Sequence, residues 1–139
     1  MIDSAGRWAT TLVAAFSLTA GASACTRSVA AGPRTIHVRI SLSRFAPDAI
    51  EVRRGDTVRF VLENADPIAH EFVIGTHAEQ MQHESGADTT HNGVAGQASL
   101  PSGETRTLMY TFAQRGPLEF ACHRPGHYAY GMRGLITVR

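Results

Sequence analysis

The stretch 117–139, PLEFACHRPGHYAYGMRGLITVR, decides what kind of domain this chain forms. Its two ends, PLEFAC at 117–122 and GLITVR at 134–139, are mostly apolar, and each has the length of a β-strand. Cys122 ends the first of these strands, and the loop that follows it contains His127 and Met132. Thiolate, imidazole and thioether groups are the ligands that soft transition metals prefer. The stretch therefore predicts a β-sheet domain with a metal site at one end of a strand.

The alternation of side chains along a strand predicts where Cys122 points. Leu118, Phe120 and Cys122 share one face of the segment PLEFAC, and the first two are expected in the core. Cys122 then points inward, where a cysteine can simply be a small buried apolar residue. His127 and Met132 follow five and ten residues later, and the turns at Pro125-Gly126 and Gly131 allow the loop to fold back over the strand end. Three soft donors can therefore meet at one point.

A fourth donor has to come from another segment, and His70 is the best candidate. It begins the segment HEFVIG and shares a face with Phe72 and Ile74, so it is expected to point inward. Two imidazole nitrogens and one thiolate in a plane, with a weak axial thioether, form a blue-copper site. Zinc sites take cysteine, histidine or carboxylate ligands instead. The predicted metal ligands are His70, Cys122, His127 and Met132.

The rest of the chain reads as further short strands. TIHVRISL at 35–42 alternates apolar and polar residues and predicts a half-buried strand, with Ile36, Val38, Ile40 and Leu42 inward. AIEVRRGDTVRFVLEN at 49–64 reads as a hairpin around a Gly-Asp turn. Segment 75–97 breaks the pattern, with a short helical turn at 77–84 and loop elsewhere. Seven or eight short strands predict an all-β sandwich or barrel, and periodicity leaves the choice open.

The ligand pattern resembles the cupredoxin family, the small blue-copper proteins that include plastocyanin, azurin and rusticyanin. The resemblance covers about residues 35–139, with His70 in an upstream turn and Cys122, His127 and Met132 in a C-terminal loop. It implies a Greek-key β-sandwich with one type-1 copper ion, a carrier of single electrons in which His127 reaches the surface. Glu71 stands where plastocyanin and azurin carry an asparagine that ties the ligand loops together. The resemblance therefore leaves the hydrogen bonding around the ligands open.

The N-terminus predicts export from the cytoplasm. Residues 1–24 read as a signal peptide that ends in small residues, and 25–34 read as a linker before the domain at 35–139. Cys25 follows those small residues as it would in a lipobox, so a lipid anchor at Cys25 and a free secreted form both stay open. The expected location is the periplasm or another extracytoplasmic site. A disulfide between Cys25 and Cys122 is the alternative use of the two cysteines there.

Composition narrows the classes of molecule that this protein is expected to bind. A net charge of +1 argues against nucleic acid as a partner. We expect a monomer that meets redox proteins or copper-handling proteins. No acid/base constellation suggests an enzyme. The alternative function is copper trafficking or copper resistance through the loop 75–93, where His77, Met81 and His83 can bind additional copper. A binding domain without redox activity is a third possibility.

Overall fold

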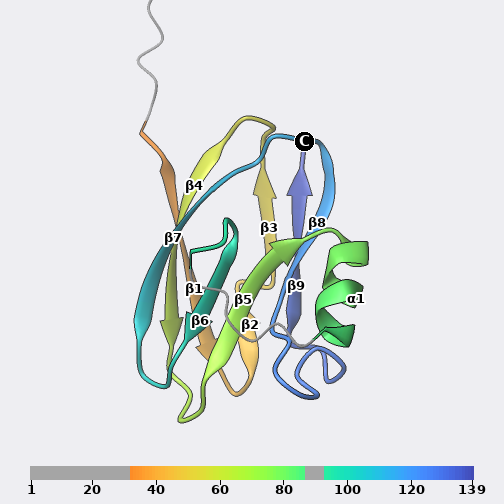
Figure 1. The fold of residues 1–139 in the computed structure, drawn as a ribbon. Coiled ribbons are helices and arrows are strands. Elements are labelled where there is room, and N and C mark those ends of the chain that lie inside the picture. The colour runs from red at the N-terminus through yellow and green to blue at the C-terminus, as the bar shows by residue number, and fades with distance from the viewer. Residues whose placement is uncertain (1–31, 87–92) are drawn as a thin grey trace, which may run out of the picture. The chain divides into compact units, whose positions relative to one another are not determined.

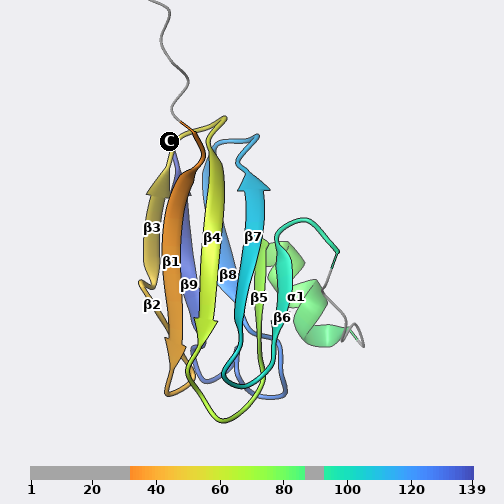
Figure 2. The ribbon, with the colours of Figure 1, turned by 90° about the vertical axis from the view of Figure 1, so that its left-hand side faces the viewer.

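The computed structural model describes residues 32–86 and 93–139, which form two β-sheets packed face to face (Figure 1, Figure 2). The first sheet has the order β2 (Arg44–Ala46), β1 (Arg34–Ser41), β4 (Thr57–Asn64), β7 (Thr105–Thr111). The second has the order β3 (Ala49–Val52), β9 (Arg133–Val138), β8 (Gly116–Ala121), β5 (His70–Gly75), β6 (Gln97–Leu100). The predicted all-β sandwich is confirmed, with nine strands in the described residues where seven or eight were expected.

The hairpin predicted over 49–64 is wrong. β3 pairs in parallel with β9, whereas β4 pairs in parallel with β1 and antiparallel with β7. The chain therefore crosses from one sheet to the other between β3 and β4, with Gly55 at a φ of 92° in the turn. The Gly-Asp signal predicted the turn correctly, but a turn in a sandwich can join two sheets as well as two paired strands.

The core lies between the sheets and follows the predicted alternation. Ile36, Val38 and Ile40 of β1 are buried, and so are the inward residues of β3 and β4: Ile50, Val52, Val58, Phe60 and Leu62. The tilted rings of Phe72 and Phe120 in the second sheet pack with their centroids 5.2 Å apart within this core. Leu42 departs from the pattern, because β1 ends at Ser41 and Leu42 begins the turn to β2, where it is 88% exposed. The expectation that Leu42 points inward is therefore wrong.

Helix α1 (His77–Ser85) covers the outer side of the second sheet beside β5 and β8 (Figure 1). The helix begins with a capping box in which Thr76 and Glu79 bond to each other's backbone N–H groups. The Gln80 amide is fully buried and donates to the carbonyls of Val73 and Glu119. Because α1 covers one face and the core covers the other, all six residues of β5 are buried. The expected helical turn at 77–84 is thus one residue longer.

Three connections gather at one end of the sandwich: the β1–β2 turn, the β4–β5 connection and the β8–β9 loop (Figure 1, Figure 2). The predicted signal peptide at 1–24 and Cys25 lie outside the described residues, as does most of the linker at 25–34. Within the described residues, no helix is both long and apolar enough to cross a membrane. The strand ends at the three connections position the residues considered next.

Candidate metal centre

Cys122 follows the last residue of β8 and is fully buried, as the alternation predicts. Its Sγ accepts a hydrogen bond from the backbone N–H of Glu71, at an N–S distance of 3.3 Å. Burial raises the pKa of the Cys122 thiol to about 11, because a thiolate is poorly solvated there, and the N–H groups of Arg124 and Glu71 only partly offset this. The thiol therefore loses its proton readily only when a cation binds beside it.

The β8–β9 loop brings His127 back to Cys122. The His127 N–H bonds to the Arg124 carbonyl, and the His127 carbonyl accepts from the N–H of Met132. The Cys122 N–H then closes the loop onto the Met132 carbonyl at 3.1 Å. Gly126, at a φ of 82°, supplies a backbone conformation that side chains disfavour. As a result, Nδ1 of His127 lies 3.4 Å from Sγ of Cys122.

His70 is the first residue of β5 and is 1% exposed. Its Nδ1 lies 4.0 Å from Sγ of Cys122, and its ring centroid lies 5.1 Å from that of His127. Its other ring nitrogen, Nε2, lies 2.9 Å from Oδ2 of Asp66. Burial, together with the nearby charges of His127 and Arg124, lowers the pKa of His70, although the Asp66 carboxylate acts in the opposite direction. A buried neutral imidazole with a free nitrogen lone pair is the form that binds a metal.

The ligand atoms of His70, Cys122 and His127 all lie within 4.8 Å of one another. Metal bonds of about 2.3 Å to sulfur and 2.0 Å to nitrogen, at a trigonal angle, put the two atoms about 3.7 Å apart. The observed Sγ–Nδ1 distances of 3.4 Å and 4.0 Å lie on either side of that value. One small cation therefore fits between these three atoms without rearrangement of the backbone, and the donor set of one sulfur and two imidazoles suits copper.

Met132 is bonded through its backbone to two of the ligand residues, Cys122 and His127. Its side chain is 1% exposed and belongs to the hydrophobic core cluster that also contains Cys122. The backbone bonds from His127 and Cys122 fix its position at the start of β9. Its role as the axial thioether ligand stays a prediction from the sequence.

Sequence reasoning missed Asn64, the residue that ties the connection leading to His70 to the end of β6. It is the last residue of β4 and is 1% exposed. Its amide donates to the carbonyls of Ile68, Leu100 and Pro101, and its Oδ1 accepts the Asp66 N–H. Asn64 therefore fixes the connection that leads to His70, although Glu71 occupies the place of the asparagine that the family resemblance implied. The available signal was an asparagine at a strand end, which marks a turn.

Comparison with known proteins agrees with this geometry. The model of copper-binding proteins of the plastocyanin/azurin family matches residues 35–139. The chain belongs to this family. It is 42% identical over 113 residues to the copper-resistant cuproprotein CopI of Rubrivivax gelatinosus, covering 76% of this chain and 67% of that one. It is 33% identical over 138 residues to the CopI protein of Pseudomonas aeruginosa, covering 76% of each chain.

Solved structures support the cupredoxin fold. The reduced auracyanin of Roseiflexus castenholzii superposes with a TM-score of 0.64 at 22% identity, covering 76% of this chain and 96% of that one. Reduced rusticyanin superposes with a TM-score of 0.55 at 19% identity, covering 78% and 82% of the two chains. Copper as the cofactor of this cupredoxin, which the sequence predicted, is thereby confirmed.

The cupredoxin site reaches the surface at His127. Its half-buried side chain lines a hollow together with Leu42, Ser43, Arg44, Pro125 and Tyr130. Leu42 is 88% exposed and Tyr130 is 81% exposed, so the rim of this hollow combines large apolar groups with the polar Ser43 and Arg44. His70 and Cys122, by contrast, are sealed from solvent. Of the three converging ligand residues, His127 is therefore the one nearest the surface.

The three residues proposed from the sequence for extra copper do not meet in the structure. The helix turns by about 200° between Met81 and His83, so the two side chains leave opposite faces of α1. His77 bonds through Nδ1 to Glu119 at 3.0 Å, and His83 Nε2 lies 3.1 Å from the side-chain nitrogen of Gln97. His91, which the same loop contains, lies outside the described residues.

His123 points away from the copper ligands, as alternation after Cys122 predicts. Its side chain is 3% exposed, and its ring stacks between those of His83 and Tyr128 at 5.5 Å and 5.3 Å. Its two nitrogens bond to Glu84 and Gln80. His123 therefore anchors α1 to β8 and takes no part in the set of converging donors.

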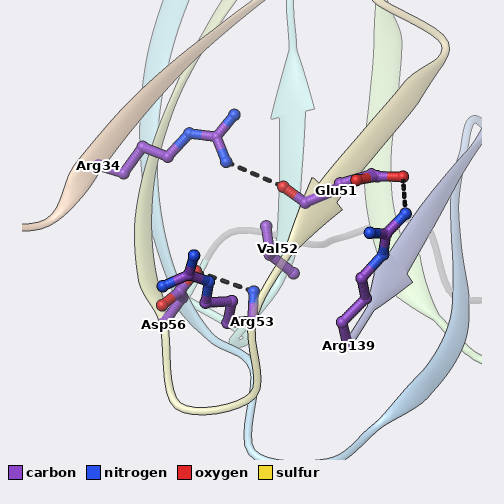
Figure 3. Close-up of a pocket in the computed structure, with 6 residues that line it drawn as sticks. All are labelled: Arg34, Glu51, Val52, Arg53, Asp56 and Arg139. Carbon is purple, nitrogen blue, oxygen red and sulfur yellow. Dashed lines mark hydrogen bonds and ion pairs between the residues drawn. The ribbon is translucent and has the colours of Figure 1, made fainter.

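A second charged region occupies the opposite end of the sandwich (Figure 3). A pocket there is lined by Arg34, Glu51, Val52, Arg53, Asp56 and Arg139. Arg34 donates to the Glu51 backbone carbonyl at 2.9 Å, and Arg139 pairs with the Glu51 carboxylate at 2.6 Å. Because these charges are solvent-exposed and partnered within the chain, the pocket offers no set of converging donors comparable to the metal centre.

Proposed function

We propose that this cupredoxin binds one copper ion that His70, Cys122, His127 and Met132 would hold, and that it serves extracytoplasmic copper resistance. The observation that carries the proposal is the preformed group of two histidines and one cysteine in a chain 42% identical to a copper-resistant cuproprotein. The predicted signal peptide supports the location. The proposal involves no enzymatic turnover, because four protein donors leave no coordination position for a substrate.

The residues divide the work of binding between them. The Cys122 thiol supplies the anionic ligand and releases its proton on binding. Its N–H···S bond from Glu71 withdraws charge from the sulfur and holds it in place. The apolar core around Cys122 excludes water, and the half-buried His127 side chain forms the accessible edge. Copper bound there supplies an intense thiolate-to-copper absorption and a one-electron couple.

The resistance role is tested in a copper-sensitive bacterial strain that lacks its own copy of such a protein. Plasmids encode the full chain, Cys122→Ser, or a triple variant with His77, Met81 and His83 replaced by alanine. We expect the full chain and the triple variant to restore growth at toxic copper, and Cys122→Ser to fail at equal protein level. Equal rescue by Cys122→Ser would contradict a role for the central site. Failure of the triple variant with a normal visible spectrum would assign resistance to α1.

Single-electron transfer is the second candidate function. It is favoured by the Sγ–Nδ1 distances of the three ligand residues, which lie close to those of a trigonal copper environment and so require little rearrangement when the copper changes oxidation state. The half-buried His127 edge, with the exposed Leu42 and Tyr130 side chains beside it, suits brief contact with a redox protein. Reversible electrochemistry of the copper-loaded protein tests this role. A site that releases copper on reduction would contradict it and leave copper binding intact.

A further inference from the structure

The Asp66 carboxylate is a buried charged group at the metal end that the ligand set alone does not explain. Its side chain is 8% exposed and lies between the β4–β5 connection and the β1–β2 turn. Oδ1 accepts the Leu42 N–H at 2.6 Å, and Oδ2 accepts the Ser43 N–H at 2.7 Å. Oδ2 also lies 2.9 Å from Nε2 of His70. Three donors therefore converge on one carboxylate beside a metal ligand.

This arrangement selects one tautomer of His70. An ionised carboxylate can only accept hydrogen bonds, so the nitrogen facing it must carry the proton. Nε2–H then donates to Asp66, and the lone pair lies on Nδ1, the atom directed at Sγ of Cys122. The same bond fixes the plane of the ring. A carboxylate behind a metal-bound imidazole also makes the imidazole a stronger electron donor.

The carboxylate serves the neighbouring turn as well. Leu42 and Ser43 have φ angles of 53° and 52°, a left-handed conformation that is unfavourable for residues other than glycine. Asp66 offsets this cost by accepting both N–H groups of the turn. The N–H groups of this β1–β2 turn also hold the Asp66 carboxylate beside His70. The same turn places Leu42 at the rim of the hollow at His127. One side chain therefore links the surface turn to a buried ligand.

We propose that Asp66 is the positioning residue for His70: it fixes the Nε2–H tautomer that leaves Nδ1 for copper and lowers the reduction potential of the site. The negative charge and the stronger imidazole donor both favour Cu(II) over Cu(I). The effect on the potential rests on the proposed function, because it requires copper at His70. The tautomer does not, since it is a property of the metal-free chain.

The test separates the two tasks of Asp66 with matched variants. Replacing Leu42→Asn and Ser43→Gly gives an Asn-Gly turn, which adopts this conformation without help from a carboxylate. In that background, Asp66→Asn removes the charge and Asp66→Ala removes the acceptor. Asp56→Asn, at the opposite end of the sandwich, is the control for loss of an aspartate charge. Thermal unfolding establishes that each variant is folded.

Two measurements are made on each protein. Nitrogen-15 NMR of the metal-free protein at about pH 8, where an ordinary histidine is neutral, reads the His70 tautomer. We expect a single Nε2–H tautomer with Asp66 present and a mixture in Asp66→Ala. Electrochemistry of the copper-loaded protein should show a higher potential in Asp66→Asn and no comparable shift in Asp56→Asn.

A protonated Nδ1 in the parent, or an unchanged potential in Asp66→Asn, would overturn the proposal. Failure of all variants and the parent to bind copper would refute the proposed function instead, and the tautomer measurement would still decide the role of Asp66. Retention of the Nε2–H tautomer in Asp66→Ala would also overturn the proposal.

Discussion

The two ends of this sandwich use an aspartate beside a turn in different ways. At the metal end, the buried Asp66 carboxylate accepts two backbone N–H groups and faces a metal ligand. At the other end, the Asp56 carboxylate accepts the N–H of Arg53 beside exposed arginines (Figure 3). Hydrogen bonds from the turn and from His70 lower the pKa of Asp66, although burial alone would raise it. The lowered pKa keeps the Asp66 carboxylate ionised although its side chain is only 8% exposed.

The contrast between the two ends shows where a polar side chain becomes indispensable. A buried polar group that loses its partner costs about 1–3 kcal/mol, because water cannot replace the lost bond. An exposed ion pair contributes about 0–1 kcal/mol, because water and salt already screen it. The metal end should therefore respond strongly to single substitutions, and the opposite end should tolerate them.

The largest expected effect follows Cys122→Ser. A neutral hydroxyl replaces the anionic ligand, so we expect loss of the intense visible absorption and of tight copper binding. Absorption spectra during a Cu(II) titration measure both. Arg53→Gln, at the opposite end, is the matched control and should titrate with one copper per chain, as the parent does. Persistence of the colour in Cys122→Ser would refute the assignment of the metal centre.

The pH dependence of the metal-free protein should also depend on Cys122. The folded-state pKa of the Cys122 thiol, about 11, lies above the ordinary cysteine value of 9.0. Because the folded chain holds the thiol proton more tightly than the unfolded chain, the thiol contributes to the unfolding free energy. This contribution is fully present below about pH 9 and is lost as the pH rises through 11. Two pKa units correspond to about 3 kcal/mol. Urea unfolding at several pH values measures it.

The control for this pH dependence is Cys122→Ser, whose side chain does not titrate in this range. The difference in unfolding free energy between the two proteins should narrow between pH 9 and 11. A constant difference would mean that the Cys122 thiol ionises in the fold as easily as in the unfolded chain. In the parent, copper binding at about pH 7 should release close to one proton per ion, since the free thiol is protonated there.

A smaller effect is expected at the glycines of the two ends. Gly134, in β9 beside the metal end, leaves no room for a side chain: a Cβ there would overlap the ring of Phe120 and lie 2.6 Å from the Asp48 carbonyl. Gly134→Ala should lower the unfolding free energy by about 2–3 kcal/mol through overpacking. Gly55→Ala, in the turn at the opposite end, meets open space and should cost about 1–2 kcal/mol from its φ of 92° alone. Equal losses in chemical denaturation would show that the core yields around Phe120.

Local rules predicted much of the metal end from the sequence. Strand alternation placed Cys122 and His70 inward, because each shares a face with core phenylalanines of its own strand. The glycines of the β8–β9 loop predicted its return toward Cys122, and His127 lies there. These inferences succeeded because they depend on period two and on turn chemistry, which act within a few residues.

Features that depend on contacts distant in sequence could not be predicted in this way. The pairing of β3 with β9 joins segments more than eighty residues apart, so the local pattern suggested a hairpin with β4 instead. Asp66 and Leu42 meet only because the β1–β2 turn and the β4–β5 connection share one end of the sandwich. Nothing in the local sequence marks Asp66 as different from Asp56, since both lie at turns. Burial distinguishes them, and burial follows from the whole fold.

The smallest expected effect lies in the pocket at the opposite end, and it tests the tolerance of that end. Glu51→Gln removes the charge that pairs with Arg139. The Glu51 side chain is 63% exposed and the Arg139 side chain is 68% exposed. The glutamine leaves the Glu51 backbone carbonyl in place, so the bond from Arg34 remains possible. We expect the unfolding free energy to change by less than about 1 kcal/mol and the copper spectrum to stay unchanged. Arg139→Gln is the reciprocal variant and should behave alike. The unfolding free energy could instead fall by well over about 1 kcal/mol at low salt and stay unchanged at high salt. That result would mean that the exposed charges couple β3 to the end of β9 more strongly than their exposure implies.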